Sequence, residues 1–376
     1  MASCAGGSLN KSIRFVDCMG LGPDVILNRQ QAERSSRTDF TDESRPNSMV
    51  ARQTGVPNDS QMKAAVYRQY GGPEQIRVER VARPIPGEGE VLIRVAGSGF
   101  NVVDTLLRAG HMSGSFPQTF PFIPNIELSG TVEALGTGVT KWQLGAQVYT
   151  SMTLTDSGGA AEFAIARAEE LAAVPRSIDL ADAGGVPLCA LTAWQLLFEH
   201  GSLERGQRVL IVGASGSVGY YAVQLSRIAD AYVVATASPS FVEAVYGLGA
   251  DEVLDYSKPN WTAESKAPFD LIVNASPAQP EQVNSWLRLL RQGGTLVSAW
   301  SPVDEAEARR LHVNGKLVYM HNSTQQLTDI ARWIEDGVLR TKIDERAGLE
   351  QVAELHARSD AGKLRGKVLI VPAGLD

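Results

Sequence analysis

The segment Arg208-Val-Leu-Ile-Val-Gly-Ala-Ser-Gly-Ser-Val-Gly219 decides the fold of this chain. Its residues 209–212 are uniformly apolar, as in a strand that is buried on both faces of a parallel sheet. Three glycines follow at intervals of three, and the next residues, Tyr-Tyr-Ala-Val-Gln-Leu-Ser, have apolar side chains at helical spacing. The segment therefore predicts a buried strand, a glycine-rich turn and a helix in direct succession.

A strand, glycine turn and helix in this order are typical of a site for the diphosphate of a dinucleotide. One glycine permits the sharp turn, the second lets the backbone approach the diphosphate, and the third lets helix and strand pack closely. The start of the helix adds unpaired N–H groups and the positive end of the helix dipole. We therefore predict that the cofactor contacts Gly213, Ser215, Gly216, Ser217, Val218 and Gly219.

The end of the next strand favours NADP over NAD. Residues 231–236 form a second apolar run, which continues as Thr236-Ala-Ser-Pro-Ser240. An NAD site needs a carboxylate here for the ribose 2′-hydroxyl, and no acid stands in this stretch to repel a 2′-phosphate. Ser238, directly before a proline, also predicts a helix start that faces the same place. The next candidates are Tyr256 and Lys258, which are either phosphate contacts or ordinary surface residues.

The composition excludes several other classes of protein. The chain has 376 residues, of which 44% are hydrophobic and 20% charged, so it is long enough for about two domains with a sizeable core. Its net charge of -7 argues against a nucleic-acid partner, and no apolar run approaches the roughly 18 residues of a membrane span. Three widely spaced cysteines suit a reducing, cytoplasmic compartment. We expect a small-molecule substrate.

Residues 1–61 differ in texture from the rest of the chain. They are rich in polar residues, as in Asn28-Arg-Gln-Gln-Ala-Glu-Arg-Ser-Ser-Arg37, and show no sustained apolar period. Such a segment buries too little to offset its ordering entropy. It lacks the apolar core of a signal peptide, and its acidic residues argue against a transit peptide. We expect a disordered N-terminal extension, or an over-extended start with Met62 as the true beginning.

After Met62 the sequence shows first a region of predicted strands and then a region in which strands and helices alternate. Short runs of strand-forming residues predict strands at 63–67, 75–78, 90–95, 128–134, 147–149 and 160–165, and the runs 75–78 and 90–95 alternate as half-buried strands do. Helical patterns appear at 180–184 and 190–198, and then strands and helices alternate at 208–213, 217–229, 231–236, 239–247, 252–254, 270–274, 280–291 and 294–299. This alternation predicts a doubly wound parallel sheet. The last part predicts helix, helix and strand at 327–337, 349–357 and 367–371.

An ordered set of landmarks spans the chain from Met62 to its end. They are Met62-Lys-Ala-Ala-Val66, Gly99-Phe-Asn-Val-Val-Asp104, Arg108-Ala-Gly110, Gly185-Val-Pro-Leu-Cys-Ala-Leu-Thr-Ala-Trp194, the glycine segment, Leu248-Gly-Ala-Asp-Glu-Val-Leu-Asp-Tyr256 and Gly362-Lys-Leu-Arg-Gly-Lys-Val368. With them the chain resembles the medium-chain dehydrogenase/reductase superfamily, and most of all its zinc-free quinone oxidoreductase and enoyl reductase branch.

The resemblance implies an α/β protein with a GroES-like β domain and a Rossmann domain. It places the GroES-like catalytic domain at 62–185, the Rossmann NADP-binding domain at 186–322, and a C-terminal segment that returns to the catalytic domain at 323–376. It also implies a homodimer formed through edge strands of the Rossmann sheet.

The resemblance argues against a catalytic zinc ion. In the alcohol dehydrogenase branch, the segment that matches Gly99-Phe-Asn101 carries a cysteine, and the one that matches Asn125-Ile-Glu127 carries a histidine before the glutamate. Neither ligand is present here, and no four-cysteine cluster offers a structural site. Because zinc needs about three protein ligands of this kind, Glu127 alone does not suffice. We predict no metal.

Without a metal, the simplest chemistry is direct hydride transfer to a polarised acceptor, for which the protein supplies position and a hydrogen-bond donor. By resemblance, Asn101 and Thr192 line the nicotinamide pocket as catalytic residues. Asn101 carries both a donor and an acceptor. The alternatives are a turn residue for Asn101 and a capping or packing role for Thr192.

Three departures from the family pattern bear on activity. Relatives often carry a tyrosine where this chain has Met112; its neighbour His111 titrates near neutrality and is a candidate proton donor, or else an ordinary loop histidine. Asn125 replaces a usual glycine, and Asn274, which we count among the cofactor contacts, replaces an acid that often follows its strand. Met112, Phe100, Phe116 and Phe122 are candidates for an apolar substrate wall or for the core.

The first functional hypothesis is therefore an NADPH-dependent, zinc-independent reductase of quinones or α,β-unsaturated carbonyls. The alternatives are an enoyl-thioester reductase of a biosynthetic pathway, or a catalytically silent NADP-binding or interaction protein on the same scaffold.

Overall fold

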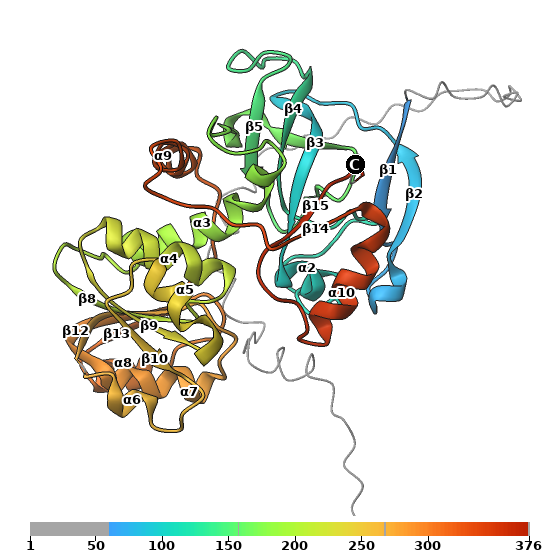
Figure 1. Ribbon diagram of the computed structural model, residues 1–376. Coiled ribbons are helices and arrows are strands. Elements are labelled where there is room, and N and C mark those ends of the chain that lie inside the picture. The colour runs from blue at the N-terminus through green and yellow to red at the C-terminus, as the bar shows by residue number, and fades with distance from the viewer. Residues whose placement is uncertain (1–59, 157, 267, 375–376) are drawn as a thin grey trace, which may run out of the picture.

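The computed structural model describes residues 60–156, 158–266 and 268–374. They form two domains, each built around its own sheet (Figure 1). Most of the extension predicted at 1–61 lies outside the described residues, but β1 already begins at Gln61. None of the helices in the described ranges is long and apolar enough to cross a bilayer.

The GroES-like domain, which by the resemblance is the catalytic domain, is built on a mainly antiparallel sheet around the long strand β3, with β14 and β15 paired in parallel at one edge. Its strand order is β14-β15-β3-β4-β5-β7, with β6 also paired to β3 and a separate β1–β2 hairpin pair beside it. The strands are β1 (Gln61–Val66), β2 (Arg77–Ala82), β3 (Glu90–Phe100), β4 (Glu127–Leu135), β5 (Gln147–Ser151), β6 (Phe163–Arg167), β7 (Ala172–Ala173), β14 (Glu345–Ala347) and β15 (Val368–Ile370).

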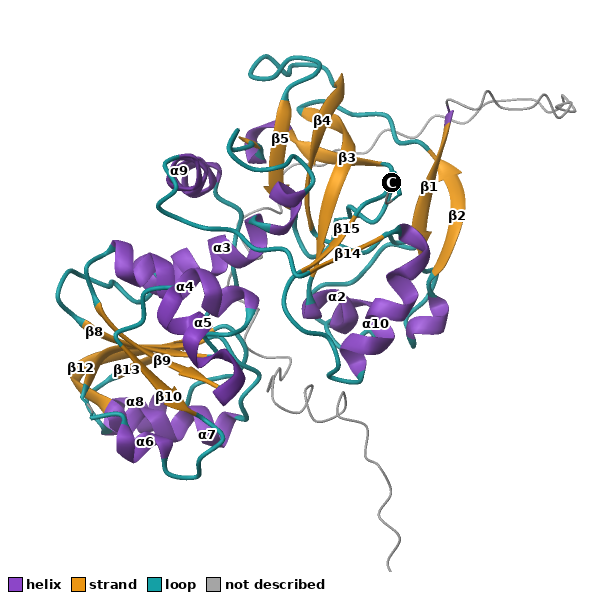
Figure 2. Cartoon of the chain, viewed as in Figure 1, coloured by secondary structure: helices purple, strands orange, loops and turns teal. Residues whose placement is uncertain are grey.

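The Rossmann domain holds six parallel strands in the order β10-β9-β8-β11-β12-β13. They are β8 (Arg208–Val212), β9 (Tyr232–Ala237), β10 (Glu252–Asp255), β11 (Phe269–Asn274), β12 (Leu290–Ser298) and β13 (Asn314–Leu317). The predicted α/β architecture with a doubly wound parallel sheet is confirmed. Helices cover both faces of this sheet, with α4 and α5 on one face and α6, α7 and α8 on the other (Figure 2).

The helices have the following bounds: α2 (Val102–Arg108), α3 (Pro187–Trp194), α4 (Ser217–Ile228), α5 (Val242–Gly247), α6 (Trp261–Glu264), α7 (Pro280–Ser285), α8 (Glu305–Arg310), α9 (Thr324–Glu335) and α10 (Val352–Asp360). Alternate residues of β8 explain why its sequence is uniformly apolar. Val209 and Ile211 pack into the core under α4, whereas Leu210 and Val212 pack against α6, α7 and α8. Both faces of the strand are therefore buried.

The C-terminal part of the chain contacts both domains. Helix α9 packs into the Rossmann core through Leu327 and Ile330, and the Tyr149 hydroxyl of the catalytic domain donates to the Leu327 carbonyl at 2.6 Å. The chain then returns to the catalytic sheet, where β15 pairs antiparallel with β3. Helix α10 packs beside α2 on the same domain. This return brings Lys367, directly before β15, against the carboxyl end of β3, where Val368 pairs with Phe100.

The structure differs from the sequence-based expectations in several short elements. Helix α2 and strands β13 and β14 were not anticipated, because they have only seven, four and three residues. The helix expected at 280–291 is wrong at its end, since Leu290 already begins β12. The helix expected at 190–198 begins at Pro187 and ends as a π-helix over Gln195–Glu199.

Gly219→Ala tests the closeness of α4 and β8. A Cβ at this position would lie 2.1 Å from the Gly213 carbonyl oxygen, which is backbone and cannot swing away. We expect a loss of about 1–3 kcal/mol in unfolding free energy, measured by urea titration. The control is Gly247→Ala in α5, where a Cβ meets nothing within 4 Å and a gain of roughly 0.5–1 kcal/mol is expected. Equal stability of the two variants would contradict the packing argument.

Candidate active site

The glycine turn has the shape that a diphosphate site requires. Gly213 has a φ of +88°, which favours glycine, and its N–H donates to the Thr236 hydroxyl at 3.1 Å. Gly219 leaves no room for a side chain, so that α4 starts directly on the strand. Gly216 is exposed, and a Cβ there would meet only the Gly213 carbonyl oxygen, at 3.3 Å. The sharp turn at Gly213 and the close packing at Gly219 are present as predicted, and the approach of a diphosphate to Gly216 stays a prediction.

The start of α4 is open to an anion. Gly216 is the N-cap and no side chain caps this end, so the first N–H groups of the helix, at Ser217, Val218 and Gly219, have no partner within the helix. Ser215, Ser217 and Val218 are half-buried and border the turn. The helix lies at the carboxyl ends of parallel strands, where nucleotides bind in sheets of this type. The residues present therefore fit the diphosphate of a dinucleotide.

The structure brings two predicted ribose-side residues together. Tyr256 follows β10, and its N–H donates to the carbonyl of Ala237 at the end of β9, at 3.4 Å. Ser238 comes next along β9, and its hydroxyl lies 3.1 Å from that of Ser240. Ser238 and Tyr256 therefore border the same edge of the sheet.

Charged groups at this edge have partners. The Asp255 carboxylate, beside Ala237 in the parallel register, accepts both the N–H and the hydroxyl of Ser257. Lys258 lies 3.4 Å from Glu264 in an exposed ion pair. Asp255, an acid near the predicted ribose side, is thus hydrogen-bonded to Ser257 in the loop that follows it.

Asn274 ends β11, and its side chain connects neighbouring segments. Its Nδ2 donates to the Ser298 hydroxyl at 3.1 Å, and its Oδ1 accepts the N–H and hydroxyl of Ser276 at 3.0 and 2.8 Å. The side chain is fully buried. Its role in the structure is to hold the ends of β11 and β12 together, and the predicted cofactor contact stays a prediction.

A buried ion pair lies where the C-terminal strand meets the catalytic sheet. The Lys367 ammonium contacts the Glu127 carboxylate, and their side chains are 5% and 0% exposed. Burial lowers the pKa of Lys367, but Cys189 and Glu127 beside it outweigh this effect and raise its pKa overall. The ammonium therefore stays protonated, and the pair is a fixed, nearly neutral unit.

Asn101 is held by this ion pair at both ends of its amide. Its Oδ1 accepts from Lys367 Nζ at 2.8 Å, and its Nδ2 donates to Glu127 Oε1 at 2.7 Å and to the Gly99 carbonyl at 3.3 Å. Cys189 Sγ lies 3.7 Å from Asn101 Oδ1, and burial raises the pKa of this thiol to about 11. The predicted catalytic amide is thus fixed in one orientation.

Thr192 belongs to the same assembly through α3. Glu127 Oε2 accepts the N–H of Leu188 at 2.8 Å, and the Thr192 hydroxyl donates to the Leu188 carbonyl at 2.7 Å, one helical turn further on. Thr192 is 8% exposed. Of the predicted catalytic residues, Asn101 therefore contacts the Glu127 carboxylate directly, and Thr192 is connected to it through the backbone of Leu188.

His111 has different neighbours. Burial and then the charge of Arg108 lower its pKa, so that the imidazole is mainly neutral at pH 7, while Asp360 acts in the opposite direction. Arg108 and Asp360 form an ion pair of 2.7 Å that joins α2 to α10. The charged groups near His111 are therefore those of the helix pair, whereas Asn101 lies against Lys367 and Glu127.

Met112, where relatives often carry a tyrosine, belongs to an apolar cluster. Met112 is buried with Leu106, Leu107 and Ile126, and Phe116 and Leu188 pack against them. Ile126 stands where zinc-dependent relatives carry the histidine. In the described ranges, no group of three His, Cys, Asp or Glu side chains is placed to hold a metal ion.

Sequence reasoning missed three members of the site. Lys367 stood in a quoted landmark but was given no role, Glu127 was considered only as a metal ligand, and Asp104 was not considered. Asp104 accepts the N–H groups of Asn101 and Asn125 at 2.8 and 3.1 Å, and burial raises its pKa to about 7. The signal was present as Asn-x-x-Asp at the start of α2, the pattern of a capping box.

Asn125 takes the left-handed conformation that suits the glycine usual at this position. Its φ is +69°, and it is fully buried. Its side-chain amide has no hydrogen-bond partner among the described residues. The departure is therefore accommodated by the backbone, at the cost of an unsatisfied amide.

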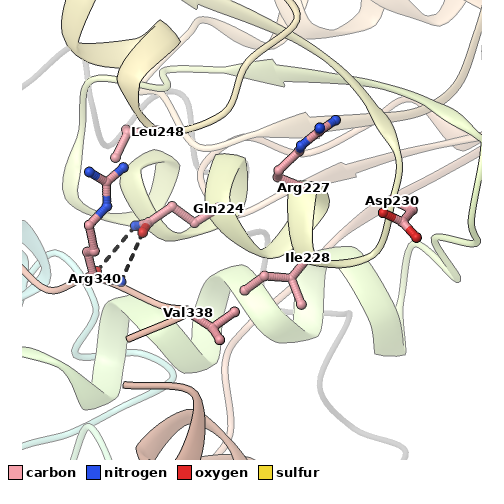
Figure 3. A pocket seen from close by; sticks show the side chains of 7 residues that line it. All are labelled: Gln224, Arg227, Ile228, Asp230, Leu248, Val338 and Arg340. Atoms are coloured by element: carbon pink, nitrogen blue, oxygen red, sulfur yellow. Dashed lines mark hydrogen bonds between the residues drawn. The ribbon is translucent and has the colours of Figure 1, made fainter. Parts of the chain in front are cut away.

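A cavity of about 400 Å³ lies away from these residues, on the Rossmann domain (Figure 3). It is lined by Gln224, Arg227, Ile228, Asp230, Leu248, Val338 and Arg340. Gln224 and Arg340 hydrogen-bond each other across it through their side-chain and backbone atoms, at 3.2 and 2.9 Å. None of its lining residues belongs to the predicted site.

Comparison with known proteins gives two family matches. Residues 87–176 match the alcohol dehydrogenase GroES-like domain, and residues 248–370 match the family described as zinc-binding dehydrogenase. Both matches fall on the two domains described above.

Among curated relatives, a chloroplastic quinone oxidoreductase of Triphysaria versicolor is 30% identical over 83% of this chain and 98% of its own length. A quinone oxidoreductase of Sus scrofa is 31% identical over 81% and 97%. Among solved structures, a mycobacterial protein in complex with NADPH has a TM-score of 0.73 at 26% identity, and the match covers 83% of this chain and all of that one (100%).

Lys367→Met tests the buried ion pair. The variant leaves the Glu127 carboxylate buried without its cation, so we expect the unfolding free energy to fall by about 3–5 kcal/mol. In the double variant Lys367→Met/Glu127→Gln no charge remains, and more than half of the loss should be recovered. Lys363→Met, at an exposed position of the same segment, should stay within about 0.5 kcal/mol of the wild type. Additive losses in the double variant would show that the two charges do not depend on each other.

His356→Leu tests a buried imidazole on α10. Both ring nitrogens of His356 are buried without a partner in the described chain, and burial, with Arg108, holds its pKa well below the ordinary value of 6.5. Below pH 6.5 the unfolded chain binds a proton that the folded chain does not, so the wild type loses stability as the pH falls. Relative to the wild type, the unfolding free energy of the variant should therefore rise by about 1.4 kcal/mol as the pH falls from 8 to 5.5, measured by urea titration. A constant difference would show that the imidazole charges in the folded state.

Proposed function

Because the chain belongs to the medium-chain dehydrogenase/reductase superfamily, in its zinc-free quinone oxidoreductase branch, we propose that it is an NADPH-dependent reductase of quinones or α,β-unsaturated carbonyl compounds. The superfamily assignment makes it an oxidoreductase. The observation that carries the finer proposal is the Lys367–Glu127 ion pair, which with Asn101 occupies the place beside β15; the part of the chain that the structure describes holds no metal-binding group.

NADP is the cofactor that the glycine turn and its neighbours support. The turn and the start of α4 fit a diphosphate, and Ser238, Ser240 and Tyr256 present hydroxyl groups at the ribose side. The mycobacterial relative was solved with NADPH. When bound, the reduced nicotinamide supplies the hydride.

The chain's own residues position the acceptor and keep water away from it. Lys367 and Glu127 hold Asn101 in one orientation, so that no reorganisation of this amide is needed during the reaction. The side chains of the apolar cluster around Met112 and Ile126 offer no hydrogen-bond partner to water. Activated alkenes conjugated to a carbonyl, and quinones, suit such a site because the negative charge left by the hydride delocalises onto an oxygen.

Two other functions are distinguished by the choice of acceptor. Turnover with a pantetheine-linked enoyl thioester alone would favour a biosynthetic enoyl reductase. Tight NADPH binding without turnover across quinones, enones and thioesters would favour a silent binding protein. The Asn101 amide supports this alternative, because both of its hydrogens are already bonded within the protein.

We further propose a small-molecule acceptor as the substrate and a homodimer formed through β13, the edge strand of the Rossmann sheet. The proposed compartment is the cytoplasm; the Triphysaria relative is described as chloroplastic, so fractionation of tagged protein is the direct measurement.

Gly216→Asp tests the cofactor site. The exposed position accepts a side chain without a severe clash, so the variant should fold. A carboxylate about 4 Å from a phosphate charge costs about 1–4 kcal/mol between the limits of water and a protein surface, so the Kd for NADPH should rise roughly 5- to 1000-fold in a fluorescence titration. Gly216→Ser, which adds a side chain without charge, should bind NADPH far more tightly than the Asp variant. Equal affinity of Gly216→Asp and wild type would refute the site.

A further inference from the structure

Reduction of an enone or quinone leaves an anionic oxygen that needs a proton, and two of the three predicted catalytic residues already donate their hydrogens within the protein. Both hydrogens of the Asn101 amide are directed to Glu127 and to the Gly99 carbonyl. The single hydroxyl hydrogen of Thr192 is directed to the Leu188 carbonyl.

The third predicted residue, His111, lies near the Arg108–Asp360 ion pair. Lys367 and Glu127 are not among the charges that act on it. The Rossmann side of the site is therefore where a further donor is to be sought.

Tyr319 lies at the carboxyl end of the Rossmann sheet, two residues after β13 ends at Leu317. The residues on both sides of it are fixed. The N–H of Val318 donates to the Ser298 carbonyl at 2.8 Å, and the N–H of His321 donates to Gln195 Oε1 at 3.1 Å. Since ligands of parallel sheets bind at the carboxyl ends of the strands, Tyr319 stands on the side where the acceptor meets the cofactor.

The Tyr319 ring faces the catalytic domain. Its centroid lies 6.4 Å from that of Phe116, within the range of aromatic contacts. Phe116 packs against the apolar cluster of Met112 and Leu188, and Leu188 is one helical turn before Thr192. Tyr319 therefore reaches, from the opposite domain, the apolar cluster that includes Leu188, whose carbonyl accepts the Thr192 hydroxyl.

The Tyr319 hydroxyl is available. It makes no hydrogen bond within residues 60–156, 158–266 and 268–374, although the ring contacts Phe116. Burial raises the pKa of Tyr319, so the hydroxyl carries its proton at neutral pH. The residue is 44% exposed, which gives the hydroxyl a route to solvent protons.

We propose that Tyr319 is the catalytic proton donor to the carbonyl oxygen of the acceptor, a role that rests on the proposed reductase function. As hydride adds to the acceptor, its π electrons move onto the oxygen. The O–H bond of Tyr319 breaks, a new O–H bond forms on that oxygen, and the phenolate recovers a proton from water. The acceptor gains one hydride and one proton in total, so no further reductant is needed.

Tyr319→Phe keeps the ring and its contact with Phe116 and removes only the hydroxyl. We expect kcat with 2-cyclohexenone or 1,4-naphthoquinone to fall by about 100-fold or more, the usual contribution of a general acid, while the Kd for NADPH stays within about twofold. Tyr246→Phe is the matched control, because Tyr246 is also 44% exposed but lies on α5. It should leave kcat unchanged.

A spectroscopic measurement tests the same contact without turnover. The absorption band of 4-dimethylaminocinnamaldehyde moves to longer wavelength when its carbonyl accepts a hydrogen bond. With NADP⁺ bound, the wild type and Tyr246→Phe should produce this shift, and Tyr319→Phe should bind the aldehyde with a smaller shift.

Unchanged kcat in Tyr319→Phe together with an unchanged band shift would overturn the role of Tyr319 while leaving the reductase intact. Absence of turnover in the wild type with every acceptor would instead overturn the proposed function, and the role of Tyr319 with it. If Tyr319→Phe lowers kcat no more than Tyr246→Phe does, the Tyr319 hydroxyl has no specific part in proton transfer. The selective loss of both kcat and band shift supports it.

Discussion

The ion pair between Lys367 and Glu127 is the contact on which the rest of the site depends. Two charges are taken out of water there, and such a pair is tolerable only where further hydrogen bonds satisfy the remaining lone pairs and protons. Asn101 and the backbone of Leu188 supply them. One carboxylate thereby joins strand β4, the residue before strand β15 and the starts of helices α2 and α3, which fixes Asn101 relative to α3.

This use of polar groups divides the site into two parts. On the side of β3 and β15 the side chains of Lys367, Glu127 and Asn101 are paired with one another, which fixes their arrangement. On the side of the Rossmann sheet, the glycine turn, the start of α4 and the loop after β13 retain unpaired groups. Groups that are free to bind a ligand therefore belong mainly to the nucleotide domain, whereas the catalytic domain supplies shape and orientation.

The sequence predicted those parts of the molecule that depend on local pattern. The glycine turn was located correctly because positive φ and close packing at Gly213 and Gly219 leave only one residue type. Lys367 was missed because a lysine among other charged residues looks exposed, and its partner lies 240 residues away. The seven residues of α2 and the four of β13 are too short to show a period. The family assignment is confirmed, whereas the roles of Asn101, Thr192 and His111 stay predictions.

The insertion of the Rossmann sheet between β7 and β14 has a consequence for biosynthesis. Strand β15 and Lys367 leave the ribosome 240 residues after Glu127, about 12 to 48 s later at ordinary elongation rates of 5–20 residues per second. At the end of that interval the Rossmann sheet has been synthesised, but β3 still lacks its pairing with β15, and Glu127 still lacks the Lys367 cation. The nascent chain therefore presents an open sheet edge, and a chaperone that shields β3 would act in this interval.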